Sequence, residues 1–105
     1  MKKAKRNKLE ARGWRVGSAS EFLELSAEDA ALVETKLALS GALRARREAK
    51  KLTQQQLAQL IKSSQSRVAK MEAGDLSVSV DLLLKGLFAL GADAREVGRT
   101  LQSAA

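Results

Sequence analysis

The sequence predicts an all-α protein with one domain, a compact helical bundle, and three observations support this prediction. The composition is rich in Ala, Leu, Lys, Arg and Gln, with no Pro and only three aromatic residues, so few residues suit a pleated sheet. Helix-capping residues recur along the chain and divide it into helical lengths. A chain of 105 residues is long enough to bury one modest core.

The first part of the chain is expected to form an arm and a helical extension ahead of the main domain. Residues 1–19 form a basic arm, which we expect to be partly disordered because its start carries almost nothing to bury. Residues 20–38 form the extension, in which Ser20 is placed to cap a short helix over EFLEL. Ser26, with Asp29 three residues later, is an acidic variant of the capping box.

The helix that begins after Ser26 is expected to be long, from about residue 27 to residue 50. Its apolar residues stay near one face of a helix, which favours packing against a core. Ser40-Gly41 lies in the middle of this helix and could bend or break it.

Shorter helices follow in the main domain, residues 39–91, and in a C-terminal helix, residues 92–105. Each begins at a side chain that can accept a hydrogen bond from the first turn. Two end at a Gly, which tolerates the left-handed conformation after a helix. The helices are expected from Thr53, with Gln56 in a capping box, to Ile61; from Ser64 to Gly74; from Ser79 to Gly91; and from Asp93, with Glu96 as its partner, onward.

The net charge of +7 is distributed in blocks along the chain. Residues 1–15 hold seven basic side chains against one acidic one, and residues 39–74 hold eight against two. Between them, residues 16–38 hold five acidic side chains against one basic one. This pattern suggests a polyanionic partner with the acidic block turned away from it, although lysines that serve solubility alone would give a similar count.

Several classes of function are disfavoured by the residues that the chain lacks. Without Cys or His there are no disulfides, no thiolate metal sites, and neither the commonest metal ligand nor the commonest general base. A Ser–Lys pair would be the remaining nucleophile and base, and no motif supports one. We therefore expect no enzyme activity, cofactor or metal. No apolar run suits a membrane span or a signal peptide, so a cytoplasmic location is expected.

The segment LTQQQLAQLIKSSQSRVAKMEAG, residues 52–74, predicts two short amphipathic helices that meet at a steep angle. Leu57, Leu60 and Ile61 give the first helix an apolar face, and Val68 and Met71 anchor the second from behind. Ala58 is the small residue expected where the helices cross most closely. The second helix would then expose a polar outer face at Gln65, Ser66, Arg67, Ala69 and Lys70.

An α-helix fits the major groove of B-DNA, where Gln can pair with adenine and Lys or Arg with guanine. The stretch LTQQQLAQLI…SQSRVAKMEAG resembles the helix-turn-helix of the phage repressor and Cro family, also called the Xre family, over about residues 39–91. The resemblance implies a helical bundle of the phage repressor type and a sequence-specific transcriptional regulator, a repressor that binds double-stranded operator DNA as a homodimer.

The resemblance also implies roles for particular residues. Base edges would be read by Gln65, Ser66 and Lys70, and backbone contacts or positioning would fall to Gln54, Ser64 and Arg67. Arg47 and Glu72 stand where the family often has a buried ion pair. The chain departs from the family at Lys62, where Gly is preferred, and in the loop DLSVS, which carries Asp75 and no base. Further phosphate contacts are therefore expected from Arg44, Lys50, Lys51 and Lys62, and from the basic arm.

Two further interpretations remain open at this point. An N-terminal extension before an Xre-type motif in a short protein also resembles antitoxins, which bind a toxin protein and repress their own operon. The chain could instead be a bridging factor that contacts the transcription machinery without reading DNA sequence. The extension itself could pack on the core or present a docking surface. The dimer surface is expected among Leu82, Leu83, Leu87 and Phe88 or at Val97 and Leu101, which could equally be core.

Overall fold

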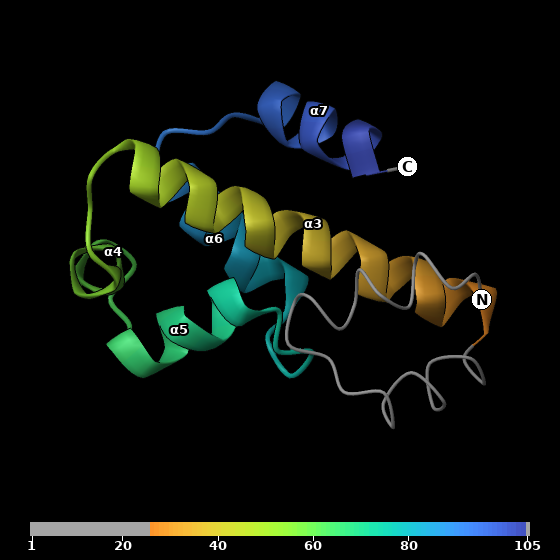
Figure 1. Ribbon diagram of the computed structural model, residues 1–105, viewed down its shortest axis with the longest axis horizontal. Coiled ribbons are helices and arrows are strands. Elements are labelled where there is room, and N and C mark those ends of the chain that lie inside the picture. Colours follow the sequence, from red (N-terminus) through yellow and green to blue (C-terminus); the bar gives the residue numbers. More distant parts are fainter. Residues whose placement is uncertain (1–25, 105) are drawn as a thin grey trace.

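The computed structural model describes residues 26–104, and over this range the chain is all-helical, without a strand (Figure 1). The expected basic arm and the short helix after Ser20 lie outside the described residues. The helices are α3 (Ala27–Ala49), α4 (Gln54–Leu60), α5 (Gln65–Ala73), α6 (Val80–Ala89) and α7 (Ala94–Ala104). No described helix is long and apolar enough to cross a membrane.

Helix α3 is one continuous element of 23 residues. It begins at Ser26, whose side chain accepts a hydrogen bond from the Asp29 backbone N–H at 3.1 Å, as the sequence predicts. The break considered at Ser40-Gly41 is absent. Ser40 is only 3% exposed and lies next to the buried Leu39, so packing on this side of the helix outweighs the weak propensity of Gly41.

Side-chain caps fix the starts of the shorter helices as predicted. Thr53 and Gln56 form a complete capping box before α4. The other helix starts use one side-chain oxygen each, which accepts from the backbone N–H three residues on: Ser64 for α5, Ser79 for α6 and Asp93 for α7. Gly74 and Gly91 have φ of 78° and 92°, the left-handed conformation expected after a helix.

Two helices end at a lysine in the left-handed conformation, where Gly is the usual residue. Lys62 has φ of 54°, as its place in the motif predicts, and Lys51 has φ of 57°, which the sequence did not reveal. After α3, Lys51 N–H donates to Glu48 O at 2.9 Å and Leu52 N–H donates to Arg47 O at 3.1 Å. This pair of bonds is a Schellman motif, and α4 ends in the same way.

The core joins one face of α3 to all the other helices. It contains Leu39 and Leu43 of α3, Leu57 and Ala58 of α4, Val68 and Met71 of α5, Leu83, Leu87 and Leu90 around α6, and Val97 of α7. Three of the residues considered for a dimer surface, Leu83, Leu87 and Val97, are therefore core residues. Phe88 is different, since its side chain is 48% exposed.

Gly86 is a position of close approach between α6 and the rest of the core. A Cβ atom there would lie 2.9 Å from Leu43 Cδ1 and 3.2 Å from Met71 Cε. The sequence had suggested such a requirement at Ala58, which is buried as well, but it did not single out Gly86. In the resulting arrangement α5 and α7 lie on opposite sides of α3 (Figure 1).

Candidate nucleic-acid interface

Helix α5 presents a polar outer face because its inner face is fixed in the core. Val68 and Met71 are fully buried. Gln65, Ser66, Arg67 and Lys70 are exposed, while Ala69 is half-buried. The first turn is capped by Ser64, so the N-terminal end of α5 is held in a defined conformation and points its side chains outward.

The corner between α4 and α5 is made by backbone hydrogen bonds around Lys62. Ser63 N–H donates to Ala58 O at 2.8 Å, and Lys62 N–H donates to Gln59 O at 3.3 Å. The left-handed conformation of Lys62 turns the chain sharply and leaves its side chain exposed just before α5. The positive charge of Lys62 therefore lies next to the start of α5.

Arg47 of α3 and Glu72 of α5 form a bidentate ion pair. Arg47 Nε lies 2.6 Å from Glu72 Oε2, and Arg47 Nη2 lies 2.9 Å from Glu72 Oε1. The side chains are only 12% and 3% exposed, and hydrogen bonding to Glu72 raises the pKa of Arg47 above its ordinary value. This pair ties the first helix of the domain to the end of α5.

Two more groups complete this junction. Arg47 Nη1 donates to the backbone oxygen of Leu52 at 2.7 Å, in the turn between α3 and α4. Gln54 Nε2 donates to Glu72 Oε1 at 3.2 Å. The carboxylate thus receives hydrogen bonds from α3 and from the first residue of α4, so the orientation of α5 is fixed relative to both helices.

A shallow depression of about 350 Å³ lies beside the outer face of α5. It is lined by Ser64, Ser66, Arg67 and Lys70 and, from the loop after α5, by Ser77 and Val78. Asp75 Oδ1 accepts from the backbone N–H of Ser77 at 2.9 Å and from Ser77 Oγ at 2.7 Å. These bonds hold the pKa of the Asp75 carboxyl below its ordinary value.

Ser77 is a residue of this surface that sequence reasoning missed. The signal was present, because an Asp followed two residues later by Ser is typical of a side-chain-capped turn. The loop after α5 is therefore a polar turn next to Arg67 and Lys70.

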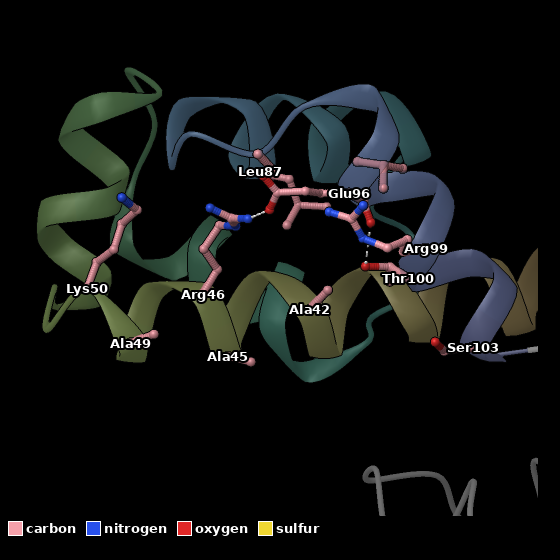
Figure 2. Close-up of a pocket in the computed structure, with 12 residues that line it drawn as sticks. Ala42, Ala45, Arg46, Ala49, Lys50, Leu87, Glu96, Arg99, Thr100 and Ser103 are labelled. Carbon is pink, nitrogen blue, oxygen red and sulfur yellow. Dashed lines mark hydrogen bonds and ion pairs between the residues drawn. The ribbon is translucent and has the colours of Figure 1, made fainter.

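The basic residues expected to contact phosphates do not all lie together. Lys62 stands at the start of α5, and Lys51 is exposed at the end of α3. Arg44 is exposed and forms an i, i+4 ion pair with Glu48 at 3.5 Å. Lys50 instead lines the groove between α3 and α7, at the C-terminal end of α3 (Figure 2).

The comparison with protein families agrees with this geometry. A helix-turn-helix family model matches residues 43–87, which run from the last two turns of α3 through α4 and α5 to most of α6. Over these residues the chain is therefore similar to a helix-turn-helix domain, the kind of domain with which transcription regulators bind DNA. About the first two thirds of α3 and all of α7 lie outside the match. No curated protein and no solved structure gives a significant match.

Proposed function

We propose that this protein is a sequence-specific transcriptional repressor of the Xre type that binds operator DNA in the cytoplasm. The observation that carries the proposal is the outer face of α5, where Gln65, Ser66, Arg67 and Lys70 are all exposed while the inner face is fixed in the core. A helix held in this way can enter the major groove with its N-terminal residues toward the base edges.

Within this proposal the residues divide into two groups. Gln65, Ser66 and Lys70 read base edges, since Gln pairs bidentately with adenine and Lys donates to guanine. Phosphates are contacted by Ser64, Arg67 and Lys62 around the start of α5, with Arg44 and Lys51 further along the backbone. Lys50 is left out of this group because it faces the α7 side of α3. Gln54 positions α5 through Glu72.

We further propose that the protein acts as a homodimer on a pseudo-palindromic operator. One recognition helix reads only a few base pairs, and two-fold pairing places two such helices about 34 Å apart on successive turns of the major groove. Paired half-sites then supply the specificity that a single half-site lacks.

The decisive experiment is selection of genomic fragments by the purified protein, followed by titration of the best site against shuffled DNA at several salt concentrations. We expect a symmetric motif bound about a thousandfold more tightly than shuffled DNA. Weak binding with a steep salt dependence and no motif would mean that charge alone holds the DNA, and the bridging interpretation would replace ours.

An antitoxin is a specialised form of the same proposal. It is favoured by the first half of α3 and by α7, which lie outside the matched domain and give the chain surfaces besides the DNA-reading one. A selected site in the protein's own promoter, together with a neighbouring gene whose product is toxic without this protein, would support it. Selected sites elsewhere only would favour a repressor of other genes.

A further inference from the structure

An open groove of about 650 Å³ runs between α3 and α7, outside the proposed DNA-reading surface (Figure 2). On α3 it is lined by Ala42, Ala45 and Ala49, whose small side chains allow close approach of another helix. Leu87 and Val97 add apolar surface from α6 and α7. Because the groove is open to solvent, it suits a segment of polypeptide better than an enclosed small molecule.

The rim of the groove carries positive charge that the described part of the chain does not neutralise. Arg46 forms an ion pair with Glu96 and also donates to the backbone oxygen of Leu90 at 3.4 Å. Within residues 26–104, neither Lys50 nor Arg99 is paired with a carboxylate, and both are exposed. An occupant with acidic side chains would therefore be complementary to this rim.

The first turns of α3 carry negative charge, in contrast to the positively charged rim of the groove. Glu28 and Asp29 are exposed there, and Leu32 is a large apolar side chain that is 47% exposed. Ala31, between them, is exposed as well. These four residues form an acidic helical surface with an apolar centre, which we call the acidic end of α3.

The acidic end cannot reach the groove of its own molecule. The acidic end and the α3 wall of the groove belong to the same unbroken helix, and Leu32 lies eighteen residues before Lys50, the C-cap of that helix, which is about 27 Å along the axis. Eighteen residues also make about five whole turns, so Leu32 and Lys50 lie on the same side of α3, as do Glu28 and Arg46. Contact between the two surfaces therefore requires a second molecule.

We propose that the α3–α7 groove binds the acidic end of α3 from a second copy of this chain, reciprocally about one two-fold axis. Glu28 and Asp29 of one copy meet Lys50 and Arg99 of the other, and Leu32 packs on the alanine side chains of the groove. The placement of both surfaces on one side of α3 permits the exchange in both directions. This inference rests on the proposed homodimer and identifies its surface. It leaves α5 free, since α5 lies across α3 from α7 (Figure 1).

Charge reversal on either surface tests the proposal, with the full chain measured by sedimentation equilibrium. The acid variant carries Glu28→Lys and Asp29→Lys, and the groove variant carries Lys50→Glu and Arg99→Glu. We expect each alone to raise the dimer dissociation constant about tenfold or more, because like charges then face each other. An equimolar mixture should regain dimerisation, since every contact in the mixed pair joins opposite charges.

A control matched to the groove variant carries Lys62→Glu and Lys70→Glu. These substitutions change the net charge by the same amount as in the groove variant, but on the α5 side of the molecule, so the dimer should stay intact. The proposal would be overturned if the wild type were monomeric or if both variants dimerised as the wild type does. It would also be overturned if the equimolar mixture stayed monomeric. The outcome is separate from that of the proposed function. If the protein dimerised through this groove but bound all DNA sequences alike, only the proposed reading of operator DNA would be refuted. If it bound a specific operator but dimerised through another surface, only this inference would be refuted.

Discussion

Single residues hold α5 in its place, and other single residues on its outer face are proposed to read bases. Arg47 and Glu72 combine short bidentate geometry with near-complete burial, and the pair receives a further hydrogen bond from Gln54. Breaking such a pair leaves a charge buried without a partner, which costs far more than the loss of an exposed pair. The outer face of α5 is different, because its exposed side chains do not support the core, and their proposed role is DNA recognition.

Arg47→Met should lower the free energy of unfolding by about 3–5 kcal/mol, because Glu72 would stay buried without its ionic partner. Arg44→Met is the matched control on the same helix, since Arg44 pairs with Glu48 only at the surface, and it should cost at most about 1 kcal/mol. Urea denaturation of both variants measures the difference. Equal midpoints would show that the ion pair contributes no more than a surface contact.

Gln65→Ala should weaken binding to the preferred operator by about 1–3 kcal/mol and relax the preference at one base pair. Gln102→Ala makes the same substitution at an exposed position of α7 and should change neither quantity. Titration against operator and shuffled duplexes separates the effects. If Gln65→Ala weakened both duplexes by the same factor, Gln65 would be a backbone contact and not a base reader.

At the scale of the elements, the least tolerant positions lie where helices end and where they cross. The lysines after α3 and α4 adopt a conformation in which a side chain is unfavourable, and each turn is nevertheless closed by two backbone hydrogen bonds. Gly86 permits a crossing that a methyl group would obstruct. The residues at these positions therefore help to set the angles at which α4, α5 and α6 pack.

Lys62 should show two separable effects. Lys62→Ala removes the charge, so it should weaken binding to all DNA sequences alike and reduce the slope of log affinity against log salt by about one. Lys62→Gly should reduce the slope equally and also stabilise the fold by roughly 0.5–1 kcal/mol, because Gly adopts the left-handed conformation without strain. Salt titrations and thermal unfolding would reveal both. An unchanged slope in either variant would exclude Lys62 from the DNA contacts.

Gly86→Ala and Gly98→Ala form a matched pair of substitutions inside helices. At Gly98 the described part of the chain places no side chain and no other helix within 4 Å of the added methyl group, so Ala should stabilise α7 through its better helix propensity. At Gly86 the methyl would crowd the buried Leu43 and Met71, and overpacking should make this variant less stable than Gly98→Ala by about 1–3 kcal/mol. Identical melting temperatures would mean that the core relaxes freely around position 86.

At the scale of the whole molecule, dimerisation and operator binding should be coupled. Joining two reading helices raises the effective concentration at the second half-site, so loss of the dimer should weaken binding to a full operator by about a hundredfold or more. The acid variant, with Glu28→Lys and Asp29→Lys, should show this loss although its net charge is more positive. Its affinity for an isolated half-site should not fall. A parallel loss on half-site and full operator would contradict the coupling.

Much of the fold was predictable because it depends on local chemistry. Capping residues at Ser26, Thr53, Ser64 and Ser79 mark where helices begin, and the spacing of Val68 and Met71 shows which face of α5 is buried. The features that escaped prediction depend on distant contacts instead. The need for Gly86 arises from Leu43 and Met71, and the α3–α7 groove arises from how α7 packs, neither of which has a local signature.

The unbroken course of α3 through Ser40-Gly41 has a consequence for how the parts of this protein communicate. Because the helix has no joint, the angle between its acidic end and Arg47 is set by the number of residues between them, at about 100° for each residue. The helix therefore fixes both the distance and the rotation between these two positions. In the proposed dimer on operator DNA, a second copy bound to α3 at Glu28 would therefore also set the direction in which α5, held through Glu72, faces the DNA.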